Sequence, residues 1–302
     1  SPYTGVILAA GKGTRMKSKK AKVLHKICGI EMVRLTADTL LYSGLDPVIV
    51  VVPSDSNEIT QVLGDKFIYV TQNQQLGSGH ALLQTQTSIN GTPSLFVINA
   101  DVPLITPQSI QNMLQTHSST SACITLLTAT VNNPTGLGRI LRSSEGDVVR
   151  IQEDLEFNDR SVTPDEINVG GYCFETSWLW DNLKTVSPSP NGEVFLTDLV
   201  RIAVQQGMLV QTVSTEKEGE AIGINSRIQL SAAERVLRQR VRENWLLKGV
   251  TMPDPETVYI DMDVVLRNDT ILHPNTHVSG ASTIGSDCQI GPNSTIVKSV
   301  VG

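Results

Sequence analysis

The sequence of 302 residues predicts an α/β fold with a mainly parallel sheet, followed by a linker helix and the start of a parallel β-helix. Three observations lead to this prediction. Short apolar runs alternate with helix-forming segments over the first part of the chain, one long amphipathic segment comes next, and a six-residue repeat of aliphatic side chains fills the remainder. We therefore expect a first domain at 1–228, a linker helix at 229–249 and a partial β-helix at 250–302.

The first domain is expected to consist of βαβ units. Apolar runs bounded by turn-forming residues predict buried strands at 6–10, 47–52, 67–70, 95–99 and 122–129. Helical segments are predicted between them at 31–41, 80–86 and 107–116. This alternation favours parallel strands with helices on both faces of the sheet. In such folds, ligands bind beyond the carboxyl ends of the strands.

The linker helix is predicted to occupy residues 231–248. Ser231 and Glu234 have the spacing of a capping box, and Gly249 offers a C-terminal stop. Apolar residues at helical spacing predict one buried stripe, and the arginines on the opposite face are expected to be solvated.

The tail has a strict six-residue period. Its aliphatic positions are Ile260, Leu266, Leu272, Val278, Ile284, Ile290 and Ile296. This period does not fit an α-helix, but it suits one side per hexad of a triangular β-solenoid. Because a solenoid must be capped or continue, and the pattern still runs at Gly302, we expect the chain to be a C-terminally truncated piece of a longer protein.

The first apolar run leads into a loop with two glycines and an excess of positive charge. Gly11 and Gly13 allow a tight turn and let backbone amides face an anion. Seven basic residues precede the first acidic one, Glu31, although the whole chain has a net charge of −6. This local excess indicates a small polyanion, most simply a nucleoside triphosphate, and not a nucleic acid. The glycine spacing fits neither the Walker loop nor the dinucleotide fingerprint.

The composition, with 40% hydrophobic and 4% aromatic residues, is ordinary for a soluble protein. No apolar run is long enough to span a bilayer, so we expect no membrane partner. The four cysteines are widely separated, which favours reduced thiols in a cytoplasm over disulfides or a zinc site.

Two residues are candidates for metal binding. Asp101 follows the apolar run 95–99, so its carboxylate would lie at the edge of the sheet where a magnesium ligand is expected. Taken alone, a helix cap or turn aspartate explains Asp101 equally well. For Asn225, a turn asparagine is the preferred interpretation from the residues alone.

The opening loop belongs to a longer motif, Leu8-Ala-Ala-Gly-Lys-Gly-Thr-Arg-Met16, followed by Lys22-Val-Leu-His25. This motif resembles the signature of sugar-1-phosphate nucleotidylyltransferases. It is most similar to the bacterial N-acetylglucosamine-1-phosphate uridylyltransferases, whose polypeptide usually also carries an acetyltransferase. The resemblance implies a Rossmann-like nucleotidyltransferase domain that forms UDP-N-acetylglucosamine and pyrophosphate from UTP and N-acetylglucosamine-1-phosphate, for cell-wall precursors. The hexads resemble left-handed β-helices, which commonly form homotrimers; the acetyltransferase site would lie in later coils.

The resemblance also implies the role of each site residue. Arg15 and Lys22 are expected to be catalytic. The residues expected to bind the nucleotide are Leu8, Ala9, Ala10, Gly11, Gly13, Gln72, Gly77 and Ser78. Those expected to bind the sugar are Asn99, Ala100, Gly138, Glu153, Asn168 and Asn225. Mg²⁺ is implied as the cofactor, with Asp101 and Asn225 as its ligands.

Two neighbouring features are interpreted as structural. His80 is expected at a helix start and not as a general base, because the attacking phosphate is already ionised at neutral pH. The run from Gly192 to Asp198 resembles a family motif and is also interpreted as the start of a helix, near the sugar site.

The sequence also allows other functions. Asn99, Ala100 and Leu155 depart from the family pattern, which leaves room for another sugar or nucleotide, such as a glucose phosphate or dTTP. A non-catalytic assembly or regulatory subunit is a further alternative. The presence of Arg15, Lys22, Asp101 and Asn225 disfavours it, because a regulatory relative would be expected to lose them.

Overall fold

The computed structural model describes residues 2–89, 91–154, 164–215, 217 and 219–302, which form two compact units. The first unit consists of Ser1–Leu24 and Val33–Gly223, and the second of His25–Met32 and Ile224–Gly302. The second unit thus includes a short segment from near the N-terminus, which domain boundaries drawn along the sequence do not anticipate.

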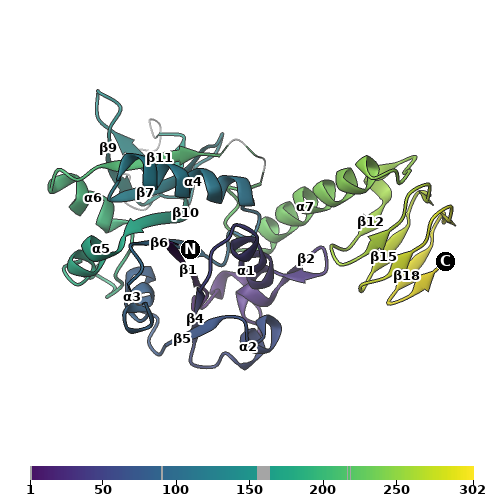
Figure 1. The fold of residues 1–302 in the computed structure, drawn as a ribbon, viewed down its shortest axis with the longest axis horizontal. Coiled ribbons are helices and arrows are strands. Elements are labelled where there is room, and N and C mark those ends of the chain that lie inside the picture. The colour runs from purple at the N-terminus through teal and green to yellow at the C-terminus, as the bar shows by residue number, and fades with distance from the viewer. Residues whose placement is uncertain (1, 90, 155–163, 216, 218) are drawn as a thin grey trace. The chain divides into compact units, whose positions relative to one another are not determined.

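One sheet, in the order β11-β7-β10-β6-β1-β4-β5, forms the centre of the first unit (Figure 1). These strands are β1 (Tyr3–Leu8), β4 (Val48–Pro53), β5 (Ile68–Gln72), β6 (Ser94–Asn99), β7 (Ile124–Thr130), β10 (Glu166–Glu175) and β11 (Val210–Ser214). β1 is parallel to β4 and β6, β4 to β5, and β7 to β11, so the predicted mainly parallel sheet is confirmed. The sequence signals do not predict β10, which is antiparallel to β6 and β7. The hairpin of β8 (Arg139–Arg142) and β9 (Val148–Gln152) pairs with β10 through β8.

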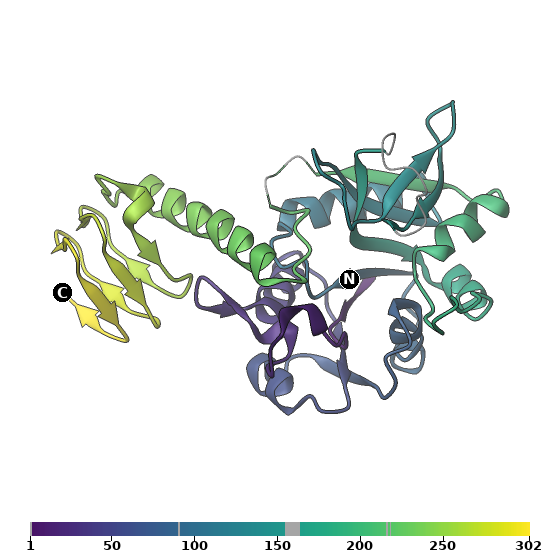
Figure 2. The ribbon, with the colours of Figure 1, turned by 180° about the vertical axis from the view of Figure 1, so that it is seen from behind.

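Helices cover both faces of this sheet (Figure 1, and from behind in Figure 2). α1 (Met32–Tyr42), α2 (Asn57–Leu63) and α4 (Pro107–Thr120) share one apolar core, which includes Ile7. α3 (Ser78–Leu83), α5 (Thr176–Leu183) and α6 (Asp198–Gln205) share the other core, which includes Val6. Adjacent residues of β1 are therefore both buried, which explains why the strand is a continuous apolar run and does not alternate.

The path of the chain creates a crevice beside β1. It passes through β1, β4 and β5 in one direction and then returns to β6, on the other side of β1. The connections before β5 run over the face of α1 and α2, whereas α3 crosses the opposite face. Such a reversal leaves a ligand-sized opening outside the carboxyl ends of the strands on either side of it.

The predicted strands and helices of the first unit overlap β1, β4, β5, β6, β7, α1, α3 and α4. Boundaries differ by a few residues: β1 runs from Tyr3 to Leu8, so Ala9 and Ala10 lie beyond its end although both are buried. The sequence signals miss α2, α5, β8, β9 and β11 because these elements are short and have mixed composition, whereas the helix start predicted at Gly192–Asp198 is confirmed by α6, which begins at Asp198. Among the residues that the structure describes, no helix is both long and apolar enough to cross a membrane.

The linker helix, α7 (Arg227–Leu247), belongs to the second unit. Its N-cap is Ser226, whose side chain accepts a hydrogen bond from the Gln229 amide, so the predicted capping box at Ser231 and Glu234 is wrong. Glu234 lies inside the helix, where its carboxylate accepts a 2.7 Å hydrogen bond from the amide of Cys28. Cys28 is in the hairpin of β2 (Lys26–Ile27) and β3 (Ile30–Glu31).

The predicted stop at Gly249 is confirmed by the hydrogen bonds that end α7. Gly249 has a φ of +86° and donates to Leu246, while Val250 donates to Trp245. This pair of bonds is the Schellman motif, in which a left-handed glycine satisfies the last free carbonyls of a helix.

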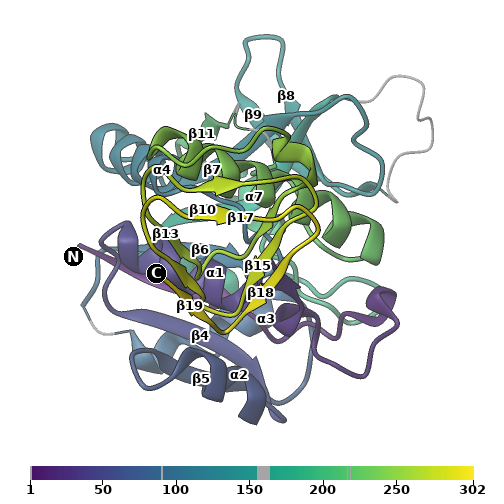
Figure 3. The same ribbon diagram turned by 90° about the vertical axis from the view of Figure 1, so that its right-hand side faces the viewer.

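The hexad region folds as a coil with three sides (Figure 3). Its strands are β12 (Tyr259–Ile260), β13 (Val265–Leu266), β14 (Ile271–Leu272), β15 (His277–Ser279), β16 (Thr283–Ile284), β17 (Gln289–Ile290), β18 (Thr295–Val297) and β19 (Val300–Val301). They form three parallel ladders, β12-β15-β18, β13-β16-β19 and β14-β17. Ile260 pairs with Val278, so three hexads complete one turn and the predicted solenoid is confirmed. Its left-handedness stays a prediction.

Most corners of the coil have a residue with a left-handed backbone. The non-glycine residues with positive φ in the repeats are Asp269, Asn275, Ala281, Asp287, Asn293 and Lys298. Aspartate and asparagine tolerate this conformation better than other side chains. Successive positions in this set are six residues apart, except that Lys298 follows Asn293 by five. Correspondingly, Ile284 pairs with Val301 and not with Gly302. The six-residue period therefore holds through Ile296 and shortens by one residue after it.

One buried histidine links the first unit's stability to pH. His117 of α4 is 3% exposed, and its Nδ1 lies 3.0 Å from the Thr125 hydroxyl. Burial lowers the pKa of His117 from 6.5 to about 4. The folded protein therefore keeps this imidazole neutral in a pH range where the unfolded chain binds a proton.

We expect this site to reduce the free energy of unfolding as the pH falls from 6.5 towards 4, by about 2 kcal/mol at pH 5. Above pH 6.5 both states are neutral and the effect vanishes. His117→Asn keeps a polar partner for Thr125 but does not titrate, so it should lose less stability between pH 7.5 and pH 5. Urea unfolding at both pH values checks this; equal losses in the two proteins would contradict it.

Candidate functional site

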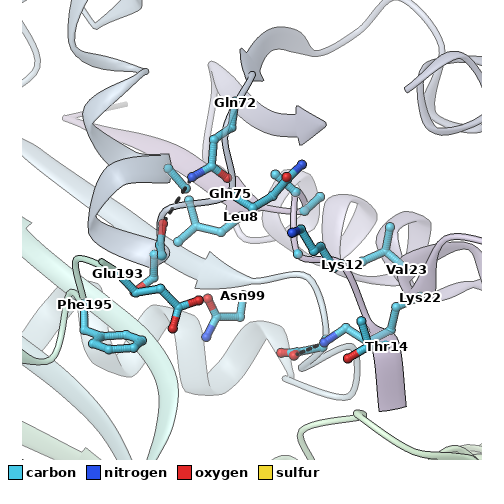
Figure 4. A pocket seen from close by; sticks show the side chains of 17 residues that line it. Leu8, Lys12, Thr14, Lys22, Val23, Gln72, Gln75, Asn99, Glu193 and Phe195 are labelled. Carbon is cyan, nitrogen blue, oxygen red and sulfur yellow. Dashed lines mark hydrogen bonds and ion pairs between the residues drawn. The ribbon is translucent and has the colours of Figure 1, made fainter. Parts of the chain in front are cut away.

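A cavity of about 460 Å³ lies at the carboxyl ends of β1, β5 and β6 (Figure 4). It occupies the crevice that the reversal of strand order creates. The sequence-predicted site residues that line it are Leu8, Ala9, Ala10, Gly11, Lys22, Gln72, Gly77, Ser78, Asn99 and Asp101. Residues spread over more than ninety positions of the sequence thus share one opening.

Sequence reasoning missed part of the cavity wall. The additional lining residues are Lys12, Thr14, Val23, Gln75, Ala81, Glu193 and Phe195. Glu193 and Phe195 belong to the run from Gly192 to Asp198, whose motif was a signal for the site but was interpreted as structural. Only the folded chain shows that this segment reaches the cavity, where Figure 4 places both side chains near Asn99.

The two glycines of the opening loop have different roles. Gly13 has a φ of +61°, and a Cβ there would lie 2.5 Å from Cβ of Lys22. A side chain at this position would therefore push Lys22 away. Gly11 has no described protein atom within 4 Å of the corresponding position, so the protein's own packing does not require it. A glycine facing open space beside a cavity lets a ligand approach the backbone closely.

Lys22 and Asp101 form an ion pair inside the cavity. Nζ of Lys22 lies 2.6 Å from Oδ2 of Asp101, and the side chains are 10% and 19% exposed. Figure 4 shows Lys22 well separated from Gln72, with Lys12 lying between them in this view. The Asp101 carboxylate, which follows the end of β6, thus already binds a cation supplied by the 3-10 turn Lys22–Leu24.

The protein offers few metal ligands at this position. In the described part of the chain, no three His, Cys, Asp or Glu side chains gather in a way that could hold a metal ion. A cation at Asp101 would therefore take most of its ligands from substrate oxygens and water, as Mg²⁺ commonly does. Asn225 belongs to the second unit, where its backbone amide donates to the side chain of Gln229. Its role as a metal ligand together with Asp101 stays a prediction.

Three other predicted residues lie near the cavity but do not line it. Arg15 is exposed on a short 3-10 turn, Thr14–Met16, and its catalytic role stays a prediction. Ala100 is buried, and its amide donates to the carbonyl of Leu8, so it contributes to the join between β6 and β1. Gly13 acts through Lys22, as described above.

At the opposite end, residues 76–79 are joined to residues 193–196. The amide of Val194 donates to Leu76, the amide of Gly79 donates to Val194, and the amide of Leu196 donates to the Ser78 hydroxyl. Gly77 has a φ of +94°, and a Cβ there would lie 2.4 Å from the Val194 carbonyl oxygen. Glycine is therefore required here by the approach of another segment, and the expected contact of Gly77 with the nucleotide stays a prediction.

Gln72 is the last residue of β5 and is 3% exposed. Its Nε2 lies 3.2 Å from the carbonyl oxygen of Gly77 and 2.9 Å from Nδ1 of His80. The side-chain amide is therefore held on two sides. His80 lies in the first turn of α3, as expected, and does not line the cavity.

The residues predicted to bind the sugar form a second group. The backbone amide of Asn168 donates to the carbonyl of Gly138. A Cβ added to Gly138 would lie 3.5 Å from Oε2 of Glu153, so the carboxylate lies close to this glycine. The Asn168 side chain donates to the Tyr172 hydroxyl at 2.7 Å. Burial raises the pKa of the Tyr172 phenol, so it stays neutral and can accept this bond.

This second group is tied to the cavity wall through Glu153. Its Oε1 accepts a 3.2 Å hydrogen bond from Thr197, two residues after Phe195. The next residue, Asp154, forms an ion pair with the buried guanidinium of Arg139. Glu153 is thus held between two anchored neighbours. Leu155, which departs from the family pattern, lies outside the described residues.

Gly77→Ala tests the contact between residues 76–79 and 193–196. The added methyl group meets backbone, and the positive φ adds strain, so we expect a loss of about 2 kcal/mol or more of stability. Gly11→Ala is the matched control, because it meets no described protein atom within 4 Å and should keep the wild-type melting temperature. Thermal unfolding of the three proteins decides; equal melting temperatures would refute the role given to Gly77.

Comparison with known proteins agrees with both parts of the fold. Residues 4–245 match the nucleotidyl transferase family, and residues 263–298 match the bacterial transferase hexapeptide repeats. The chain is 41% identical over 301 residues to the bifunctional protein GlmU of Exiguobacterium sibiricum, covering 99% of this chain and 67% of that protein. It is 38% identical to the bifunctional protein GlmU of Clostridioides difficile, covering 99% and 66%. The chain thus spans about two thirds of the length of these relatives.

A solved structure shares the fold at much lower identity. A candidate glucose-1-phosphate thymidylyltransferase from Bacillus anthracis superposes with a TM-score of 0.65 at 17% identity, covering 78% of this chain and 94% of that one. This likeness concerns the fold alone. The family match extends over most of the sequence and includes the cavity, and the relatives are similar over nearly all of it. The chain therefore belongs to the nucleotidyl transferase family.

Proposed function

We propose that the first unit transfers a uridylyl group from UTP to N-acetylglucosamine-1-phosphate, giving UDP-N-acetylglucosamine and pyrophosphate. The observation that carries this proposal is that the two ends of one cavity differ in chemistry. The Lys22–Asp101 ion pair lies at one end, and the fixed amide of Gln72 lies at the other. The two ends of a nucleoside triphosphate differ in the same way, with a base that forms hydrogen bonds at one end and a chain of anionic phosphates at the other.

In this reaction an oxygen of the sugar phosphate attacks the α-phosphorus of UTP, and pyrophosphate leaves. Both reactants are anions, so the protein must hold them together and offset their charge. Lys12 and Lys22 line the cavity and supply mobile positive charge. The backbone beside Gly11, open to the cavity, can approach the phosphates closely. No general base is needed, which agrees with the position of His80 outside the cavity.

Magnesium fits the donors that the cavity presents. The Asp101 carboxylate already binds one cation, the Lys22 ammonium. Mg²⁺ held by Asp101 would supply positive charge between the phosphates of the two substrates. Lys22 would then be displaced from Asp101 and could bind a phosphate oxygen, because it lines the same cavity. We propose Asn225 as the second ligand, on the family resemblance alone.

The sugar phosphate is proposed to bind between Asn99 and the group of Gly138, Glu153 and Asn168. Asn99 connects them, because its amide nitrogen lies 2.8 Å from the Cβ position of Gly170, two residues after Asn168 on β10. Amide and carboxylate groups suit sugar hydroxyls and an N-acetyl group. Phe195 and Thr197 belong to the segment between this group and the cavity.

Three broader properties are also proposed. Exposed apolar side chains on the coil, including Val297 and Val300, suit packing against identical coils, and we propose a homotrimer. The four free cysteines suit a cytoplasmic location. The proposal for this chain covers uridylyl transfer, and acetyl transfer is not expected of it.

Pyrophosphate release tests the proposed reaction. With UTP, N-acetylglucosamine-1-phosphate and Mg²⁺, we expect stoichiometric pyrophosphate and UDP-N-acetylglucosamine. The same assay is run with glucose-1-phosphate and with dTTP. No release from the first pair, together with release from another pair, would assign the cavity to a different sugar or nucleotide. No release from any pair would support a non-catalytic subunit.

If the Lys22 ammonium and a divalent metal ion compete for the Asp101 carboxylate, removing Lys22 should strengthen metal binding. Lys22→Ala removes the resident cation, so the protein without nucleotide should bind Mn²⁺ about tenfold more tightly, while turnover falls at least about 100-fold. Asp101→Asn keeps the shape but should lose both Mn²⁺ binding and turnover. Mn²⁺ binding is followed by electron paramagnetic resonance. Unchanged Mn²⁺ affinity in Lys22→Ala would show that Lys22 and the metal do not share this carboxylate.

A further inference from the structure

We propose that His80 is a positioning residue that sets base selectivity, because it locks the Gln72 amide with only its oxygen available to the cavity. This proposal rests on the proposed function, since it concerns the base of the nucleotide in that site. It assigns to His80 a role that its location outside the cavity does not suggest.

The first step is the orientation of the Gln72 amide. The carbonyl oxygen of Gly77 can only accept a hydrogen bond, so the Gln72 atom 3.2 Å from it must be the NH₂ group. The same NH₂ group lies 2.9 Å from Nδ1 of His80, which must therefore be an unprotonated acceptor. The neutral imidazole then carries its hydrogen on Nε2.

The second step is a count of hydrogens. A side-chain NH₂ group has two hydrogens, and Gly77 and His80 accept one each. No donor capacity is left on Gln72. Its Oε1 has no hydrogen-bond partner among the described residues, and Gln72 lines the cavity. Gln72 therefore presents an acceptor, and not a donor, to whatever binds there.

The alternative orientation is disfavoured by burial. If the Gln72 amide were reversed, its oxygen would face the Gly77 carbonyl, and a residue that is 3% exposed has little room to relieve this repulsion. The reversed arrangement would let Gln84 donate to Nε2 of His80, at 3.3 Å. Gln84 is only half-buried and already donates to the His80 carbonyl at 3.1 Å, so it can adjust at the surface.

A fixed acceptor selects bases by their edge. Uracil and thymine carry a hydrogen on N3 and can donate to Oε1 of Gln72. Where Oε1 faces N3 of the base, cytosine presents a lone pair and two acceptors would face each other; its nearest donor, the 4-amino group, lies one position further along the edge, so cytosine would have to shift to pair with Gln72. An unmatched polar group in a buried site commonly costs a factor of about 10 to 100 in binding. The arrangement therefore favours UTP and dTTP over CTP, and it would favour CTP if Gln72 were reversed.

The test compares nucleotide affinities by calorimetry, with UTP and CTP as the probes and no sugar phosphate. Wild-type protein should bind UTP at least about tenfold more tightly than CTP. His80→Phe keeps the ring but removes the acceptor, and the UTP/CTP ratio should fall several-fold towards one. His80→Asn places an amide oxygen near the position of Nδ1 and should restore most of the ratio. Gln84→Ala, the control on the other side of His80, should keep the wild-type ratio.

The outcomes separate this proposal from the proposed function. An unchanged ratio in His80→Phe, or a wild-type preference for CTP, would overturn the role of His80 even if uridylyl transfer is confirmed. Selective UTP binding that depends on His80 would support it even if no pyrophosphate is released. Should His80→Phe fail to fold, NMR of the wild-type side-chain amides provides the second measurement. Both Nε2 hydrogens of Gln72 should exchange slowly with solvent, and rapid exchange of either would contradict the lock.

Discussion

The site depends on the 2.6 Å ion pair between Lys22, in the 3-10 turn Lys22–Leu24, and Asp101, just beyond the end of β6. This contact requires that β1 and β6 be neighbours, although the chain visits β4 and β5 between them. It also requires Gly13, whose left-handed backbone and missing side chain leave room for Lys22. The opposite charges stabilise each other inside a partly buried cavity.

The other end of the cavity is organised by backbone contacts instead of charge. The segment 76–79 is joined to 193–196 by three hydrogen bonds, and Gly77 allows their close approach. The carbonyl of Gly77 also holds Gln72. One glycine thus connects the cavity wall that contains Glu193 and Phe195 to the residue proposed to bind the base. The contacts that hold this wall in place therefore also hold the side chain of Gln72.

Much of the fold follows from patterns in the sequence. The hexads predict the three-sided coil because a six-residue period allows each aliphatic side chain to point inward on a successive side. The apolar runs predict most of the parallel strands because a sheet covered on both faces buries nearly every residue of its central strands, β1, β4 and β6. The antiparallel β10 was missed because strand direction depends on partners distant in the chain. The capping box at Ser231 was wrong because Ser226 offers an equally good cap earlier, and Glu234 bonds instead to a hairpin more than two hundred residues away.

Patterns in the sequence predict the class of the protein, the glycine-rich cationic loop and the acidic residue after the fourth predicted strand. These are local features, set by residue type and short spacing. Which of these features come into contact follows from the path of the folded chain. The fold pairs Lys22 with Asp101 and brings Phe195 to the cavity. It also places His80 where its ring nitrogen can orient the side-chain amide of Gln72. Hydrogen bonds and ion pairs act over about 3 Å, but the residues that form them can be far apart in the chain. Ser78 and Leu196, for example, are 118 residues apart.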